Sequence, residues 1–250
     1  MYTLIINTRK DGLNQMRDTL YVLGDSIARG IMLDEKTGRY GLCRNTFDTA
    51  LKLSGTKVYN YAKMGMTSED ALSLIDKCGQ AENAVAAIEF GGNDSDLNWN
   101  EVQDAPGIFH EAAIPIPKFE KNLACLIEKT RKRGMRPVIV TPLPLSAERF
   151  FAYVAHNRDA NAILTYLGTK QSIYRWQERY STAAIRAAHS AKCPVFDARS
   201  LFLNRMDFDS LIGPDGMHPS EKGYKVLADA VVNAWNNGIH EFTQSVFHTA

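Results

Sequence analysis

Ser26, Asp215 and His218 have the residue types and the spacing that nucleophilic catalysis needs. Ser26 comes directly after a short apolar segment that ends at Gly24, where a strand is expected to turn into a helix. The positive end of that helix and the exposed backbone N–H favour an oxyanion formed by attack of the hydroxyl. Asp215 precedes His218 by three residues in a segment rich in Gly and Pro. A tight turn there can bring the carboxylate to Nδ1 and leave Nε2 facing a hydroxyl.

Each of these residues also has an ordinary structural interpretation. Ser26 alone is most simply the N-cap of a helix, and His218 alone is an ordinary polar loop residue. The remaining histidines occur in long loops, on a helix or near the C-terminus, without a carboxylate arranged nearby: His110, His156, His189, His240 and His248. His218 is therefore the histidine that best fits the role of a base.

Two further residues could donate hydrogen bonds to a developing oxyanion. Gly65 offers an unshielded backbone N–H, and Asn93 offers its side-chain amide from the end of an apolar segment. Taken singly, Gly65 suits a loop position with positive φ, and Asn93-Asp94 suits a turn or a cap. Ser26, Gly65, Asn93 and the pair Asp215 and His218 form four features. The four features follow four different expected strands, in the order that one crevice requires.

The elements that must position these residues alternate between short apolar and longer amphipathic segments from about residue 18 to 237, which predicts βαβ units and a parallel sheet. Strands are expected at 20–24, 57–61, 84–90, 137–141 and 194–197, and helices at about 40–54, 68–79, 117–133, 171–191 and 220–237. Ligands bind such sheets outside the carboxyl ends of the strands, where the four features lie.

Two connections, 95–116 and 143–170, are longer than most in α/β units, and connections of that length are usually functional. The second contains several aromatic residues and is expected to form a helical insertion over the sheet edge. Trp99, Tyr174 and Trp176 could stack on sugar rings, and the alternative is that they are packing aromatics.

Composition indicates one globular domain over residues 1–250, with its core at about 18–237. The formal net charge of +1 argues against a nucleic-acid partner. No apolar run reaches the length of a membrane span and no signal peptide is evident, so a cytoplasmic protein is expected. The four cysteines are scattered singly and are interpreted as buried free thiols. Neither a cofactor nor a metal is expected, and the oligomeric state stays open, a homo-oligomer included.

The four features resemble the sequence blocks of the SGNH hydrolases, also called GDSL-type lipases and esterases. The matching residues are Gly24-Asp25-Ser26, Gly65, Gly91-Gly92-Asn93-Asp94, and Asp215 with His218. Ile27 replaces the Leu of the first block, which is a conservative change. The resemblance spans about residues 20–235 and leaves out the two long connections and both ends of the chain.

The resemblance implies a flavodoxin-like three-layer α/β/α sandwich with a five-stranded parallel sheet. It implies that Ser26 is the nucleophile, His218 the general base and then acid, and Asp215 its orienting partner. It also implies an oxyanion hole formed by the backbone N–H groups of Ser26 and Gly65 and the side chain of Asn93. The larger α/β-hydrolase fold fits less well, because its G-x-S-x-G elbow would need Gly at Ala28.

The predicted function is a serine esterase for small acyl esters, with O-acetyl groups on carbohydrate as the first choice of substrate. A lipase, phospholipase or thioesterase of the same fold is the alternative within this chemistry. A non-catalytic binding module would be expected to lack Ser26, Asn93, Asp215 or His218, and all four are present. A nucleotide-binding protein is disfavoured because no glycine-rich phosphate motif follows any expected strand.

Overall fold

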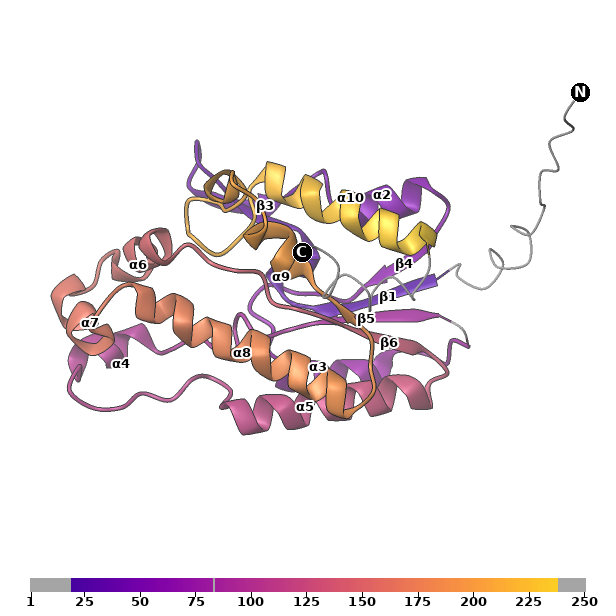
Figure 1. Cartoon of the computed structure of the whole chain (residues 1–250), viewed down its shortest axis with the longest axis horizontal. Helices are drawn as coiled ribbons and strands as arrows, with labels where there is room; N and C mark the ends of the chain where they lie inside the picture. Colours follow the sequence, from indigo (N-terminus) through magenta and orange to yellow (C-terminus); the bar gives the residue numbers. More distant parts are fainter. Residues whose placement is uncertain (1–18, 83, 238–250) are drawn as a thin grey trace, which may run out of the picture.

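The computed structural model describes residues 19–82 and 84–237. Its main sheet contains the parallel strands β1 (Thr19–Gly24), β4 (Lys57–Asn60), β5 (Val85–Glu89), β6 (Arg136–Val140) and β7 (Val195–Phe196). The strand order is β4-β1-β5-β6-β7 (Figure 1). The chain places β4 on one side of β1 and then β5, β6 and β7 on the other side, so the strand order reverses between β1 and β5. The predicted five-stranded parallel sheet is confirmed, and its flavodoxin-like order places a ligand crevice at the ends of β1 and β5.

Helices cover both faces of the sheet and one of its ends. Their bounds are α1 (Ser26–Arg29), α2 (Phe47–Leu53), α3 (Ser68–Leu74), α4 (Trp99–Asp104), α5 (Ile116–Lys132), α6 (Ala147–Ala155), α7 (Ala160–Leu167), α8 (Gln171–Ser190), α9 (Ala198–Leu203) and α10 (Glu221–Asn237), with 3₁₀ turns at Ile75–Lys77 and Phe208–Ser210. In Figure 1, α2 and α10 lie above the sheet, and α3, α5 and α8 lie below it. This arrangement is the predicted three-layer sandwich.

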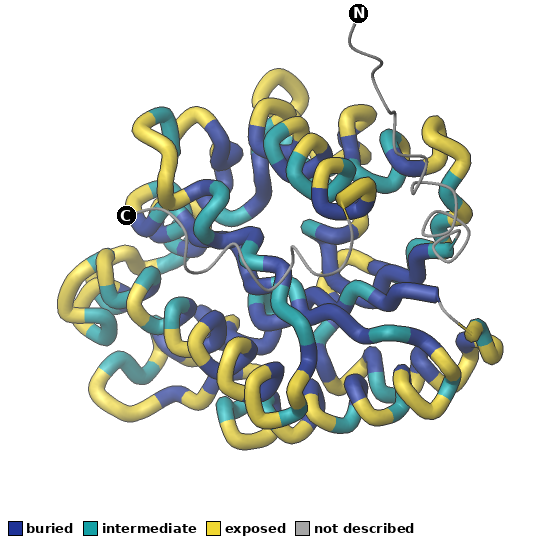
Figure 2. Tube along the Cα trace, turned by 45° about the vertical axis from the view of Figure 1, so that its right-hand side comes forward, coloured by how far each residue is buried: buried dark blue, intermediate teal, exposed yellow. Residues whose placement is uncertain are grey.

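The core follows from the sequence pattern of the strands. β1 is buried along almost its whole length, as expected for a strand that is covered on both faces. One apolar cluster, which includes Leu23, Ile88 and Phe119, packs against α3, α5 and α8, and a second, which includes Val22, Val138 and Phe202, lies on the other face. Figure 2 shows the strands as a buried centre inside a more exposed shell of helices.

The helix predicted from about residue 40 is wrong at its start. Residues Arg39–Leu42 form β3, which pairs with β2 (Ile31–Asp34) as an antiparallel hairpin, and the helix begins only at Phe47. The turn between the strands is closed by Asp34, whose Oδ1 accepts hydrogen bonds from the backbone N–H groups of Lys36 and Thr37. This Asx turn, followed by Gly38, favours a hairpin over a helix.

The long connections are partly helical. The connection after β5 contains α4, and the one after β6 contains α6 and α7, so the expected helical insertion is present. These helices and the start of α8 share a third apolar cluster, which includes Trp99, Phe151 and Ile163. In Figure 1 they form the left end of the molecule, beyond the sheet. No helix within 19–82 or 84–237 is long and apolar enough to cross a membrane. A single domain over residues 1–250 stays a prediction.

Candidate active site

Ser26, His218 and Asp215 form one hydrogen-bonded chain. Nε2 of His218 lies 2.8 Å from Oγ of Ser26, and Nδ1 of His218 lies 2.7 Å from Oδ2 of Asp215. The three residues are 7%, 3% and 1% exposed, so water screens these contacts weakly. The structure thus brings together a hydroxyl and a base that are 192 residues apart in the sequence. This arrangement can take the proton from Ser26 as its oxygen attacks.

The turn between β1 and α1 positions Ser26. Asp25 is the N-cap of α1, and its Oδ1 accepts a hydrogen bond of 2.8 Å from the backbone N–H of Ile27. A Cβ atom at Gly24 would lie 2.6 Å from Cβ of Ala28, so only glycine allows the strand to turn this sharply. Ser26 is consequently the first residue of a helix that starts where β1 ends.

The segment before α10 positions Asp215 and His218. Oδ1 of Asp215 accepts hydrogen bonds of 3.0 Å from the backbone N–H groups of Met217 and His218, which folds the carboxylate back onto the imidazole. An antiparallel bridge between Ile212 and Pro219 closes this loop. Burial acts to raise the pKa of Asp215. The hydrogen bond and charge of the His218 side chain, together with the hydrogen bonds from the two backbone amides, outweigh burial and hold the pKa of Asp215 below its usual value. Asp215 therefore stays ionised and can stabilise an imidazolium.

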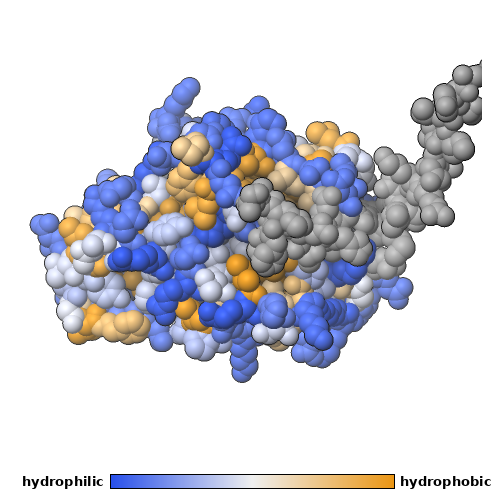
Figure 3. All heavy atoms as spheres, in the orientation of Figure 1, coloured by the Kyte–Doolittle hydropathy of each residue, from blue (hydrophilic) through white to orange (hydrophobic). Residues whose placement is uncertain are grey.

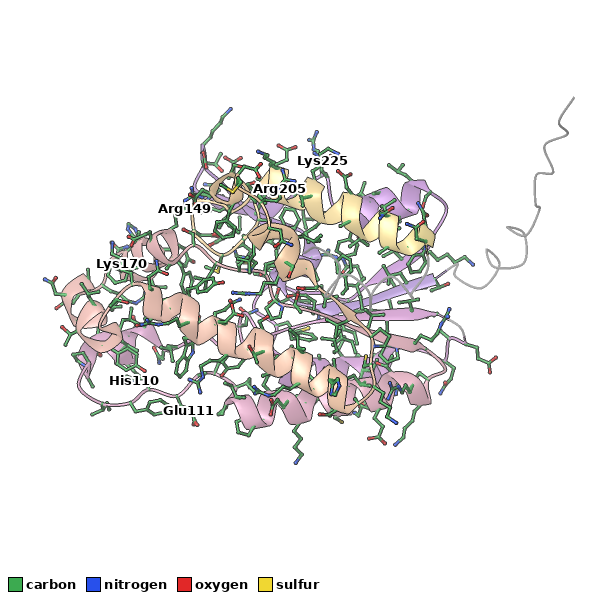
Figure 4. The ribbon with its side chains drawn as sticks, viewed as in Figure 1. His110, Glu111, Arg149, Lys170, Arg205 and Lys225 are labelled. Atoms are coloured by element: carbon green, nitrogen blue, oxygen red, sulfur yellow. The ribbon has the colours of Figure 1, made fainter. Side chains whose placement is uncertain are left out.

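Glycine at position 216 and an arginine join this loop to α6. Gly216 has a φ of +78°, and a Cβ atom there would clash with the backbone N of Phe150, so the loop packs directly on the helix. Its carbonyl accepts a hydrogen bond of 2.8 Å from the backbone N–H of Ser146. Arg149, labelled in Figure 4, donates hydrogen bonds to the carbonyls of Asp209 and Ile212. The loop is thereby tied to the helical end of the molecule.

Tyr40 is a site residue that the sequence analysis missed. Its hydroxyl lies 3.2 Å from Oδ2 of Asp215 and donates a hydrogen bond to it, and its ring lies edge-on to His218, with centroids 5.2 Å apart. Burial raises the pKa of Tyr40 well above its usual value, so the phenol keeps its proton and remains a donor. Tyr40 lies on β3, where a helix was expected, which is why it was overlooked. The signal that could have found it is the turn at Asp34–Gly38, which predicts a hairpin.

Asn93 lies beside Ser26, and its side-chain amide is already hydrogen-bonded. Nδ2 donates to Oδ2 of Asp25 at 3.1 Å and to the carbonyl of Met66 at 3.1 Å. Gly65, the neighbour of Met66, is exposed with a φ of +77°, a conformation that favours glycine. An oxyanion would therefore have to share the Asn93 donor with these acceptors. The oxyanion roles of Ser26, Gly65 and Asn93 stay a prediction.

Three buried acids lie beneath the site. The backbone N–H of Asp25 is 3.4 Å from Oε2 of Glu89, which is 5% exposed. Burial, and then the nearby charge of Asp25, raise the pKa of Glu89 well above its usual value, and burial also raises the pKa of Asp25. Asp94 accepts hydrogen bonds from the backbone N–H and hydroxyl of Ser68, yet burial raises its pKa to about 6. Glu89 thus joins the end of β5 to the residue after β1, and Asp94 joins the segment after β5 to the start of α3.

A cavity of about 230 Å³ opens beside Ser26, Asn93 and His218. Of the three aromatic residues predicted to stack on sugars, Trp99 and Trp176 line this cavity, whereas Tyr174 instead contacts the guanidinium of Arg199. Among the other histidines, His110 lies at the helical end (Figure 4), where its Nε2 is 2.9 Å from the carbonyl of Ala105. His240 and His248 lie outside the described residues.

Comparison with known proteins places the chain in a family. Residues 20–231 match the model of the family GDSL-like Lipase/Acylhydrolase. A stretch of 171 residues is 23% identical to the isoamyl acetate-hydrolyzing esterase of Saccharomyces cerevisiae, and covers 67% of this chain but only 64% of that esterase, which is less than two thirds of its length.

Solved structures share the fold. A lipase/acylhydrolase from Enterococcus faecalis superposes with a TM-score of 0.60 at 20% identity, over 88% of this chain and 95% of that one. An acetyl xylan esterase from Geobacillus stearothermophilus superposes with a TM-score of 0.59 at 18% identity, over 86% and 93%. Because the family model spans most of the sequence, from β1 to α10, the chain belongs to the GDSL-like lipases and acylhydrolases.

Proposed function

We propose that this protein hydrolyses carboxylic esters of small acyl groups through an acyl-enzyme on Ser26. The observation that carries the proposal is the unbroken chain from Oγ of Ser26 through His218 to Oδ2 of Asp215, with separations of 2.8 Å and 2.7 Å. Membership of a family of ester hydrolases supports it. Ser26 acts as the nucleophile, His218 as the base and Asp215 as the group that orients and stabilises the imidazole.

The reaction proceeds in two halves. Oγ of Ser26 bonds to the acyl carbon as Nε2 of His218 takes the hydroxyl proton, and His218 then gives that proton to the alkoxide as the ester C–O bond breaks. Water repeats the sequence on the acyl-enzyme, which releases the acid and restores Ser26. The negative charge on the acyl oxygen is stabilised by the backbone N–H groups of Ser26 and Gly65 and by Asn93.

The natural ester is proposed more specifically as an acetate. The names of an isoamyl acetate-hydrolyzing esterase and of an acetyl xylan esterase among the similar proteins support a small acyl group. An O-acetylated carbohydrate is the ester expected from the sequence and one candidate for the natural substrate, and a lipase, phospholipase or thioesterase reaction on the same three residues stays the alternative.

The test compares hydrolysis of p-nitrophenyl acetate by the wild type, by Ser26→Ala and by a control, Ser54→Ala. Ser54 lies at the end of α2, where its hydroxyl binds only the carbonyl of Leu51 among the contacts described. Ser26→Ala is expected to abolish turnover with an unchanged melting temperature, and Ser54→Ala to keep it. Turnover by pure Ser26→Ala at more than about one thousandth of the wild-type rate would end the assignment of the nucleophile.

A further inference from the structure

We propose that the cavity beside Ser26, hereafter the chamber, binds an apolar alkyl or aryl group on the alcohol side of the substrate ester; this rests on the proposed ester hydrolysis. The chamber lies between the catalytic residues and the helical end of the molecule.

The walls of the chamber are largely apolar. They are built by Leu97, Trp99, Leu145, Leu167, Ile173 and Trp176, which come from the connection after β5, from the start of the insertion, and from α7 and α8. Most of these residues belong to or pack against the third apolar cluster, so the walls are held by their own core. In Figure 3 the left end of the molecule, over α4, α6 and α7, shows apolar residues among hydrophilic ones.

Most polar groups of the walls are already hydrogen-bonded within the protein; for the Asp96 carboxylate, which also lines the chamber, the hydrogen bonds described are those accepted by Oδ1. Nε1 of Trp99 donates to Oδ1 of Asp96 at 2.9 Å, and Nε1 of Trp176 donates to the carbonyl of Ser95 at 2.8 Å. The same is true of the remaining side-chain amide and hydroxyl groups of the walls: Ser95 (to Gly92), Tyr166 (to His110), Ser172 (to Leu167) and Gln177 (to Leu143 and from Arg199). A ligand therefore meets mainly carbon atoms.

This lining disfavours a sugar in the chamber. A buried hydroxyl without a hydrogen-bond partner loses its bonds to water and weakens binding, whereas an apolar group gains from leaving water. Among the described residues, no lysine or arginine lines the chamber. The two indoles that were predicted to stack on sugar rings thus serve better as walls for an alkyl or aryl group.

The volume sets the size of the group. An apolar cavity of about 150 Å³ in another protein holds benzene. The chamber, at about 230 Å³, also includes the space above Ser26 where the ester itself must sit. A benzyl or hexyl group is therefore a good match, and an ethyl group leaves much of the chamber unfilled.

The position of His218 assigns the chamber to the alcohol side. Nε2 of His218 gives its proton to the leaving oxygen, so the alcohol must begin next to this atom. His218 and its neighbour Met217 both form part of the chamber wall, as do Ser26 and Asn93, whereas Gly65, the third proposed donor to the acyl oxygen, does not. A small acyl group would then extend from the space above Ser26 away from the apolar walls.

The first experiment measures kcat/KM for ethyl, butyl, hexyl and benzyl acetate, with glycerol monoacetate and an O-acetylated methyl glucoside as polar controls. We expect kcat/KM to rise roughly threefold per methylene from ethyl to hexyl acetate, since each buried methylene has a favourable transfer free energy. The polar controls should not exceed ethyl acetate. A parallel series of p-nitrophenyl esters from acetate to hexanoate should fall or stay level.

A second experiment uses two changes at Leu167, a chamber residue, and a control at Leu164 on the same helix, which is partly exposed and not part of the wall. Leu167→Asn places an amide in the wall and Leu167→Trp fills the space. Each should lower the ratio of kcat/KM for hexyl over ethyl acetate by about tenfold, and Leu164→Asn should keep the wild-type ratio.

The outcomes separate this proposal from the proposed function. If wild-type protein cleaves p-nitrophenyl acetate but its alcohol series is flat, if the sugar acetate is the best substrate, or if the acyl series is the steeper one, the chamber assignment is wrong and the ester hydrolysis stands. Equal ratios in the Leu167 and Leu164 variants would also overturn the assignment. If no ester is cleaved at all, the proposed function itself fails.

Discussion

Glu89→Gln tests whether a neutral carboxyl group lies beneath the nucleophile. Glu89 is buried at the end of β5, and among the described residues its Oε1 has no hydrogen-bond partner. Its Oε2 faces the backbone N–H of Asp25 at 3.4 Å. Glutamine has the shape of the protonated acid, and its amide oxygen can accept the same hydrogen bond, so the variant is expected to fold.

The magnitude follows from proton binding. Unfolded, Glu89 loses its proton near its ordinary pKa of 4.5, whereas in the folded protein burial raises that pKa well above this value. Between the two pKa values the folded state holds one proton more than the unfolded state, so the free energy of unfolding of the wild type falls as pH rises. The loss is about 1.4 kcal/mol per pH unit for one proton. Glutamine cannot titrate, so the free energy of unfolding of Glu89→Gln does not include this fall with rising pH.

The assay is urea unfolding of wild type and Glu89→Gln at several pH values from 5 to 7. We expect the free energy of unfolding of the variant, relative to the wild type, to increase by about 1.4 kcal/mol per pH unit until the folded-state pKa of Glu89 is reached. Glu35→Gln, at an exposed position in the β2–β3 turn, should follow the wild type at every pH. A difference between Glu89→Gln and wild type that does not change with pH would refute the argument.

Four further substitutions probe the candidate catalytic residues with p-nitrophenyl acetate. Asn93→Ala should lower kcat by roughly 10²- to 10³-fold, as loss of one oxyanion donor does, and an effect confined to KM would mean that Asn93 only binds substrate. Tyr40→Phe keeps the ring against His218 but removes the hydrogen bond to Asp215, so kcat/KM should fall roughly five- to tenfold; an unchanged rate would show that this bond has no catalytic effect. Asp215→Asn should lower the rate of hydrolysis by up to about 10⁴-fold. Adding His218→Ala should scarcely lower this rate further, because the effects of residues that act as one unit are not additive. Fully multiplicative losses in the double variant would show that the two residues act separately.

Much of the fold was predictable because the strands of the main sheet are short, mostly apolar and separated by longer amphipathic segments. The five strands of the main sheet, its parallel pairing and the helices α2, α3, α5, α8 and α10 follow from this pattern. The placement of Ser26, Asn93 and His218 at one edge also follows, since the carboxyl ends of parallel strands meet there. The structure brings all three to the same cavity.

The remaining features depend on contacts that local sequence does not encode. Tyr40 reaches Asp215 across 175 residues, from a hairpin whose strands are too short and too exposed to show a clear period. The hydrogen bond from Asn93 to Asp25 depends on the distance between two strand ends. The character of the chamber depends on which way the indole N–H groups of Trp99 and Trp176 point, and that is decided by packing.

The most direct test of the central claim is to locate the nucleophile chemically. The protein is treated with diethyl p-nitrophenyl phosphate, which phosphorylates activated serine hydroxyls, and digested peptides are analysed by mass spectrometry while esterase activity is followed. We expect a single diethylphosphoryl group, on the peptide that contains Ser26, formed in step with the loss of activity and absent from His218→Ala. Loss of activity with the label on another residue, or full activity after complete labelling of Ser26, would contradict the proposed mechanism.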